Sequence, residues 1–411
     1  MYFSCRFLFF DQKKDGLSTL VKVVLDAFAE ELQDSHPHLD TRGTSLLFGK
    51  LLGACDQLSA STFADVLDRT NARDIAKASE GAHWDVFRVS TPGGAAVLKV
   101  LHVEYIARYA KELCNHLLVA RALERLSDGR GSNFTTGFVL VTRAVCVWDG
   151  YPQELSDACR RFAAARRDTA SRNVDHIIDY RQVPQPYLVL QTGYAGIPLS
   201  SVETLSASQV VSVFRQVILT LAVAEAAFNF EHRHLSLESI YVTRTQRESI
   251  EWKVEGRLYR VQTRGVIAHV ADFSAARMDI DDETQFSDPR PLWEDCKRDR
   301  SLKDIHRIIR DDISTDWSTR CPRTNVLYAY HVTRELVDRF AASHRQDGDE
   351  DEKAEWEEFQ TWKFRLPWFP SVAEFARDAF ASPEASRFSS VVAKMGQFVT
   401  RSLSSLTGGD A

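Results

Sequence analysis

Three segments of the chain carry side chains that could handle a phosphoryl group. Lys99 stands in an apolar run, His234 follows His232 and Arg233, and Asp272 opens the triplet Asp-Phe-Ser. A lysine ammonium pairs with phosphate oxygens, a carboxylate is a ligand for Mg²⁺, and an imidazole accepts a proton in its neutral form. These side chains would act together only if Lys99 and Asp272 met across a crevice.

The order of two of these segments follows a known catalytic pattern. A protein-kinase catalytic loop reads H-R-D-L-x-x-x-x-N, and a metal-binding D-F-G follows on the next strand. Here His234 stands where the base Asp belongs, Ser239 stands where the Asn belongs, and Asp272 keeps the place of the metal ligand. A lone His-Arg pair would carry no information, whereas the two motifs in this order and spacing are moderately specific.

The segment before Lys99 corresponds to the region that would cover the phosphates. Val97-Leu98-Lys99 resembles the third-strand lysine motif of kinases, and only Gly81 survives of a G-x-G-x-x-G loop. An ordinary turn between strands explains Gly81 equally well. Trp84 stands at a glycine position, where it could pack over a nucleotide or block it.

The elements that must position these residues form two groups. Strands are expected at 77–89, with a Gly-containing turn, at 95–100 after the turn Gly93-Gly94, and at 138–141 and 187–190. Helices are expected at 17–33, at 62–68 behind a Ser/Thr cap, at 104–126, within the insertion 155–175, and from Ser206 to Phe230. Short β segments at 239–243 and 266–271 interrupt the helical half, and the acidic run 347–358 is expected to be solvated.

Strands first and helices second predict an α+β fold in two lobes, a β-rich N-lobe and a helical C-lobe as in protein kinases. We place an N-terminal extension at residues 1–43, the N-lobe with its hinge at 44–200, the C-lobe at 201–400 and a disordered tail at 401–411. An alternative outside the kinase class is a helical scaffold that carries these motifs by chance. The ordered matches across both lobes disfavour this alternative.

Several further motifs narrow the resemblance to haspin-like Ser/Thr kinases. Phe230-Glu-His-Arg233 is similar to the haspin entry into the catalytic loop, and the stretch from Tyr187 to Leu199 is similar to the haspin hinge. Asp304-Ile-His-Arg and Asn325-Val-Leu resemble segments of the haspin C-terminal lobe. The resemblance covers about residues 50–345 in the right order.

This resemblance implies an ATP:protein phosphotransferase that acts on Ser or Thr, in haspins on a histone tail during mitosis. It also implies ATP and Mg²⁺ as cofactors and an intracellular, nuclear or cytoplasmic location. Carried over by position, Lys99 would hold phosphates, Asp272 would hold Mg²⁺, and the hinge backbone at Gly193, Tyr194 and Ala195 would meet adenine.

Other positions depart from the pattern. His234 provides no fixed negative charge, and loss of a general base typically forfeits about 10²–10⁴-fold in rate. Ser239 is a poorer ligand for a second metal ion than an amide, and Glu238 is either a compensating ligand or a solvated loop charge. The helix partner of Lys99 is either His116 or Glu112. These departures leave open a pseudokinase, catalytically inactive and kept as a binding scaffold with or without nucleotide.

Composition limits the partners. A net charge of −6 and a pI near 6.1 argue against direct nucleic-acid binding, although the acidic stretch Asp279–Glu283 could receive a basic tail or be merely solvated. The seven scattered cysteines form no C-x-x-C pair, which favours reduced intracellular thiols. The apolar residues 1–10 lack a basic leader, and no later segment is expected to span a membrane.

Overall fold

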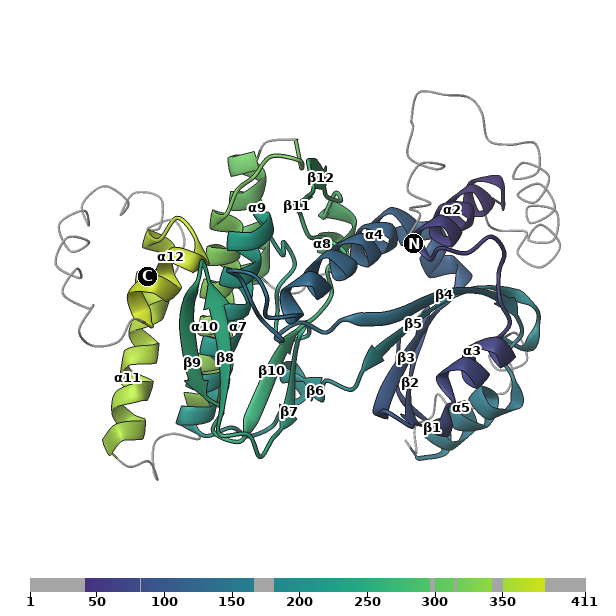
Figure 1. Ribbon diagram of the computed structural model, residues 1–411, viewed down its shortest axis with the longest axis horizontal. Helices are drawn as coiled ribbons and strands as arrows, with labels where there is room; N and C mark the ends of the chain where they lie inside the picture. The colour runs from purple at the N-terminus through teal and green to yellow at the C-terminus, as the bar shows by residue number, and fades with distance from the viewer. Residues whose placement is uncertain are drawn as a thin grey trace. The chain divides into compact units, whose positions relative to one another are not determined.

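The computed structural model describes residues 41–81, 83–165, 181–295, 300–313, 316–341 and 350–380. The expected helix at 17–33 and the expected disordered tail lie outside these residues. The chain divides into two compact units (Figure 1). Unit 1 comprises the described parts of residues 1–121 and 140–194, and unit 2 comprises residues 122–139 and the described residues from 195 onward.

Unit 1 is built on one antiparallel sheet with the strand order β1-β2-β3-β5-β4. Its strands are β1 (Arg73–Gly81), β2 (Trp84–Thr91), β3 (Gly94–Leu101), β4 (Val141–Asp149) and β5 (Gln185–Gly193). Its helices are α2 (Thr41–Ala54), α3 (Phe63–Thr70), α4 (Val103–Glu124, which continues into unit 2) and α5 (Gln153–Ala165).

Apolar residues cover both faces of this sheet because successive strand side chains point to opposite sides. On one face Phe87, Val89 and Leu98 join a core with α3 and α5. On the other face Leu101 and Leu190 join a core with α2 and α4. The strand that carries Lys99 is therefore held from both sides.

Local signals explain the ends of several unit 1 elements. Thr62 caps α3 with a capping box to Asp65, as the Ser/Thr signal predicts. The hairpin between β2 and β3 turns on Pro92 and Gly93, and Gly94 opens β3 at a φ of 112°. The expected strand at 138–141 is wrong, because β4 begins only at Val141.

Unit 2 is organised around α7 (Ala207–Phe228), which is buried along nearly its whole length. Ser206 caps its first turn with a capping box to Gln209, as predicted. α7 is long and apolar enough to cross a bilayer, contrary to our expectation for the later segments, and 83% of its most apolar window is buried within the fold. Inside this unit it acts as the central core helix.

Four pairings supply the strands of unit 2. β7 (Ile240–Arg244) and β10 (Val266–Val270) are the two expected β segments; they pair with each other, and β7 also pairs with the short β6 (Ile197–Pro198). β8 (Ser249–Val254) and β9 (Arg257–Gln262) form a hairpin that the sequence analysis missed. β11 (Met278–Ile280) and β12 (Glu283–Gln285) form a second hairpin after the Asp-Phe-Ser motif.

Helices make up the rest of unit 2. They are α8 (Arg290–Asp295), α9 (Arg300–Ile313), α10 (Arg323–Phe340), α11 (Glu350–Arg365) and α12 (Val372–Ala379), with single 3₁₀ turns at 125–127, 199–201 and 366–368. The described part of the acidic run lies on α11. A sheet-rich unit and a mainly helical unit confirm the predicted α+β class.

Candidate active site

The catalytic loop of unit 2 follows directly from the end of α7. Asn229 ends the helix in a left-handed conformation, φ 49°, and its side-chain amide donates to Asp279 over 2.9 Å. Glu231 then forms a two-way backbone bridge with Arg277, 2.8 Å in each direction. These contacts tie the start of the loop to the segment that follows the Asp-Phe-Ser motif.

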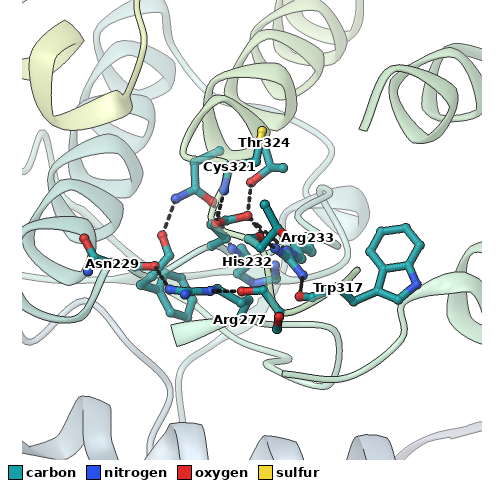
Figure 2. Close-up of polar contacts among 12 residues, drawn as sticks. Asn229, His232, Arg233, Arg277, Trp317, Cys321 and Thr324 are labelled. Carbon is teal, nitrogen blue, oxygen red and sulfur yellow. Dashed lines mark hydrogen bonds and ion pairs between the residues drawn. The ribbon is translucent and has the colours of Figure 1, made fainter. Parts of the chain in front are cut away.

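Arg233 is held on all sides within this loop, as Figure 2 shows. Its side chain is fully buried and its backbone is left-handed, φ 60°. The guanidinium donates to Glu231 at 2.9 and 3.0 Å and to the carbonyls of Trp317 and Thr319 at 2.6 and 2.8 Å. Arg233 therefore fixes the shape of the loop from the protein interior.

Asn325 on α10 holds the segment Phe230–His232 of the same loop. Its side-chain oxygen accepts from the N–H of His232 at 2.9 Å, and its amide donates to the carbonyl of Phe230 at 2.8 Å. The same amide group donates to Glu225 on α7, also at 2.8 Å. Asn325 is fully buried, so all three bonds are made away from water.

His232 joins the loop to the metal motif. Its Nε2 lies 2.9 Å from the carbonyl of Ala271, and because a carbonyl only accepts, Nε2 carries the proton. Burial lowers the pKa of His232 to about 4, so the ring is neutral at physiological pH. Phe273 is fully buried, with its ring centroid 6.2 Å from that of His232 and 5.6 Å from that of Phe138.

The candidate reacting groups of unit 2, Asp272 and His234, lie on the more accessible side of this scaffold. Asp272 adopts a left-handed backbone, φ 64°, and its side chain is 44% exposed. Residues held in such conformations concentrate at functional sites. His234 Nδ1 lies 3.7 Å from Asp272 Oδ2. A protonated imidazole here would form an ion pair with the carboxylate that a cation needs.

Ser239 reaches the same region but uses its hydroxyl within the loop. Its Oγ donates to the carbonyl of Ser236 and accepts from the N–H of Ser236, both at 3.0 Å, and the residue is 5% exposed. Its own carbonyl accepts from Ala271 at 2.8 Å. One lone pair of the hydroxyl remains, which makes Ser239 a weak candidate ligand, while Glu238 beside it is exposed.

Unit 1 brings together Gly81, Trp84 and Lys99. Gly81 and Trp84 close the hairpin between β1 and β2, and a Cβ built on Gly81 would lie 2.3 Å from the Trp84 indole. Any larger residue at position 81 would therefore displace this ring. The Lys99 ammonium lies 5.1 Å from the centroid of the same indole, within cation–π range. Trp84 thus covers the glycine turn and contacts the candidate phosphate ligand.

The hinge segment connects the two units. Gly193 ends β5 opposite Ala96, and Tyr194 donates its N–H to the carbonyl of Ala95 over 3.2 Å. Ala195 is the first residue of this segment in unit 2. Gly196, which the sequence analysis passed over, is required sterically: its φ is 98° and a Cβ would lie 2.0 Å from the carbonyl of Val242.

Both candidates for the helix partner of Lys99 lie on α4, in the same unit as the lysine. Glu112 is buried and His116 is half-buried. Lys99 itself belongs to unit 1 and Asp272 to unit 2, so their meeting across a crevice stays a prediction.

The residues present fit one Mg²⁺ brought in with a nucleotide. Mg²⁺ is commonly held by one or two carboxylates together with substrate phosphates, and Asp272 offers an accessible carboxylate. When bound, the ion would neutralise negative charge on the phosphates. The engaged hydroxyl of Ser239 fits a second ion poorly.

Sequence reasoning missed the residues that hold the loop. Asn325 belongs to the Asn-Val-Leu motif, but we predicted no role for its side chain. We predicted no role for Glu231 or Glu225 either. Their partners lie far away in the sequence, 93 residues for the bond from His232 to Asn325, and no local pattern predicts such a pairing. A polar residue on an otherwise apolar helix face was the one available signal.

The fold and the loop together define the class of the protein as a protein kinase. One unit is rich in sheet and carries a lysine on its third strand. The other unit is mainly helical, and its catalytic loop is hydrogen-bonded to the metal motif. The family model described as "Haspin like kinase domain" matches residues 46–361. The chain therefore belongs to the haspin-like kinase family.

Individual relatives agree with this assignment. The serine/threonine-protein kinase haspin of Bos taurus is 25% identical over 314 residues, which are 72% of this chain and 38% of the relative. The haspin homologs of Drosophila melanogaster and Arabidopsis thaliana are 24% and 25% identical, over 70% and 81% of this chain and 52% and 55% of their own lengths. The chain thus spans about half or less of the relatives it matches.

Proposed function

We propose that this chain is a weakened haspin-like serine/threonine kinase domain, which binds ATP with Mg²⁺ and transfers the γ-phosphoryl group to a basic protein segment of the histone-tail kind. The observation that carries the proposal is Asp272, an accessible carboxylate on a left-handed backbone, supported by a loop that buried hydrogen bonds hold in place. ATP and Mg²⁺ follow from Lys99 and Asp272 in their motif positions.

The proposed step makes a bond from a Ser or Thr hydroxyl oxygen to the γ-phosphorus and breaks the bond to ADP. His234 would take the hydroxyl proton in its neutral form. Nε2 would be the acceptor if the proton of the neutral ring were on Nδ1, the nitrogen that lies 3.7 Å from Asp272 Oδ2. The absence of a fixed negative charge at position 234 leaves the hydroxyl less firmly oriented, so we expect a slow enzyme.

The acidic hairpin after the metal motif is the proposed contact for a basic substrate. Asp279 is bonded to Asn229 and Thr284, and Asp281 pairs with Arg125 at 3.2 Å. Asp282 and Glu283 are exposed at the turn. We therefore assign the attraction of a basic segment to these last two carboxylates.

A second candidate function is a catalytically inactive pseudokinase that serves as a binding scaffold. It is favoured by His234 at the base position, by the engaged hydroxyl of Ser239 and by the Trp84 ring over Gly81. In this case the nucleotide is either a structural ligand or excluded by Trp84.

Nucleotide binding is tested by thermal unfolding with and without millimolar ATP and Mg²⁺. A ligand that binds only the folded state raises the melting temperature, and we expect Lys99→Ala to remove that rise. Lys111→Ala is the matched control, because Lys111 is an exposed lysine of the same unit. Absence of any shift in the wild type would leave a nucleotide-free scaffold.

Chemistry is tested by transfer of radiolabelled phosphate to a histone-tail peptide. We expect a slow wild-type rate that Asp272→Asn abolishes and that His234→Asp raises by about 10²-fold, the lower end of the usual contribution of a general base. If ATP binds but neither the wild type nor His234→Asp transfers phosphate, the scaffold is the correct function.

A further inference from the structure

A groove of about 810 Å³ lies in unit 2 away from the catalytic loop. Residues of β9, α11 and α12 line it, and the first half of α7 contributes Ser212 and Arg215 among others. The catalytic loop follows the opposite end of α7, after Phe228. The proposed phosphoryl transfer does not involve this groove.

The strand that borders the groove has an open edge. Hydrogen-bonded and non-bonded pairs alternate in an antiparallel hairpin, and the bond from Thr263 N–H to the Glu248 carbonyl fixes which pairs are bonded. By this alternation the backbone groups of Leu258, Arg260 and Gln262 point away from β8. The Gln262 carbonyl confirms the direction, because it accepts from the Ser212 hydroxyl of α7 at 2.7 Å.

Two residues of this edge remain available. Within the described ranges, no residue bonds to the outward N–H or C=O groups of Leu258 and Arg260. Such a row of backbone groups is a template for an added strand. The Leu258 side chain is 55% exposed beside it, an apolar contact point within the groove.

The lining of the groove is basic on balance. Five arginines line it: Arg215, Arg257, Arg260, Arg264 and Arg365. Three carboxylates oppose them, those of Glu355, Glu358 and Asp378. Arg215, Arg264 and Arg365 pair with these carboxylates, whereas Arg260 pairs with Glu251 outside the lining and Arg257 stacks on Tyr259 at 5.3 Å. Among the described residues, Arg257 at the start of β9 is therefore the one arginine of the lining without a carboxylate partner.

We propose that the edge of β9 binds an extended, acidic segment of a partner protein as an added β-strand. Backbone bonds to Leu258 and Arg260 would supply affinity, Arg257 and Arg260 would favour acidic side chains on the two faces of the added strand, and the exposed Leu258 would favour an apolar side chain opposite it. Arginines alone would merely protect an edge from pairing. The groove and the exposed leucine beside them provide the space and the apolar contact that recognition requires.

The test measures fluorescence anisotropy of a fluorescein-labelled seven-residue peptide of Glu and Val with the central sequence Glu-Val-Val-Glu against the full chain, because this order allows Glu opposite both Arg257 and Arg260 and Val opposite Leu258. Two matched peptides serve as controls, one with Lys in place of Glu and one with N-methyl groups on alternate backbone nitrogens. We expect both control peptides to bind at least about tenfold more weakly, because one reverses the charge and the other removes the strand bonds.

Variants of the chain locate the site. We expect the double change Arg257→Glu and Arg260→Glu to weaken binding of the acidic peptide at least about tenfold, and Arg320→Glu, at an exposed arginine outside the groove, to leave it unchanged. Leu258→Pro removes an outward N–H without touching the bonds to β8, since proline is tolerated on such an edge. It should weaken the Glu/Val peptide and leave the hairpin folded.

Three results would overturn the proposal. Equal binding of the N-methylated peptide would show attraction by charge without strand pairing. No binding at about 1 mM peptide would leave the edge without the proposed ligand. A wild-type dimer in sedimentation that the double arginine change converts to monomer, together with no peptide binding, would assign the edge to a second copy of the chain. None of these results depends on nucleotide binding or phosphoryl transfer.

Discussion

The catalytic loop has an inner side that faces α10 and an outer side that carries His234, the candidate base. The two sides differ in burial and in hydrogen bonding. On the inner side Arg233 and Asn325 are fully buried, and together they make seven hydrogen bonds, to the carboxylates of Glu231 and Glu225, to three backbone carbonyls and to the His232 N–H. On the outer side His234 stands where the kinase motif has its base Asp, beside the accessible carboxylate of Asp272. None of these seven bonds involves His234 or Asp272.

This difference separates the question of fold from the question of activity. A buried charge or amide that loses its partner costs the full desolvation of the group left behind, so the inner side tolerates little change. An accessible side chain loses only weak contacts when it is replaced. Substitutions on the two sides should therefore differ in their effect on stability, from the largest on the inner side to the smallest on the outer side.

Glu231→Ala is expected to have the largest effect. It leaves the buried Arg233 guanidinium without a counter-charge, and breaking a buried pair in this way typically costs about 3–5 kcal/mol. Urea unfolding followed by tryptophan fluorescence measures the loss, with Glu248→Ala at an exposed site as the control. A loss below about 1 kcal/mol would mean that the inner side does not hold the loop.

Asn325→Ala is expected to follow. It removes three hydrogen bonds and leaves the His232 N–H and the Phe230 carbonyl buried, at a cost of about 2–3 kcal/mol. Asn133→Ala is the matched control, because the Asn133 side chain also accepts from a backbone N–H, that of Glu255, but at an exposed site. Similar losses for the two variants would contradict the importance of burial here.

These inner contacts mark the limit of what the sequence could predict. Caps at Thr62 and Ser206 and the strands around Lys99 were predictable, because each depends on residues within a few positions of one another. The bond from Asn325 to Glu225 spans 100 residues and depends on how α7 and α10 pack, so no local signal predicts it. The positions of His234 and Asp272 were predictable as motifs, but not their 3.7 Å contact.

Two errors have different causes. The β8–β9 hairpin was readable, since Ile250, Trp252 and Val254 alternate with polar residues before the turn Glu255-Gly256, but it lies between the two motifs and was passed over. Residues 138–141 are apolar because Phe138 packs in the core, not because the segment is a strand. Phe138 makes a single bridge to Val270 and packs its ring near those of Phe230 and Phe273.

Glu225 predicts a pH dependence that belongs to the inner side. Burial raises the pKa of this carboxyl to about 8, although Asn325 and the N–H groups of Ala373 and Val372 donate to it. The folded state then binds a proton that the unfolded state, with a pKa near 4.3, has released, so stability falls as the pH rises towards about 8 and is level above it. The slope is at most about 1.4 kcal/mol per pH unit.

His232 opposes this trend at lower pH, because its lowered pKa of about 4 makes stability rise with pH until the unfolded ring has titrated, near 6.5. We therefore expect the fall due to Glu225 to be clearest between about pH 6.5 and 8. Urea unfolding across this range should show it in the wild type and not in Glu225→Gln. Glu374→Gln, at an exposed carboxyl of α12, should keep the slope. A slope that survives Glu225→Gln would place the titrating group elsewhere.

His234→Ala is expected to have the smallest effect on stability. The side chain is 20% exposed and its partner Asp272 is 44% exposed, and ion pairs between such groups are worth less than about 1 kcal/mol. His232→Ala, two residues earlier and fully buried, should cost more than about 2 kcal/mol, because it removes the bond to Ala271 and leaves a cavity beside Phe273. If the two alanine variants unfold at the same urea concentration, His234 stabilises the loop as much as His232 does. The presence of His instead of Asp at position 234 would then affect the stability of the loop as well as its chemistry.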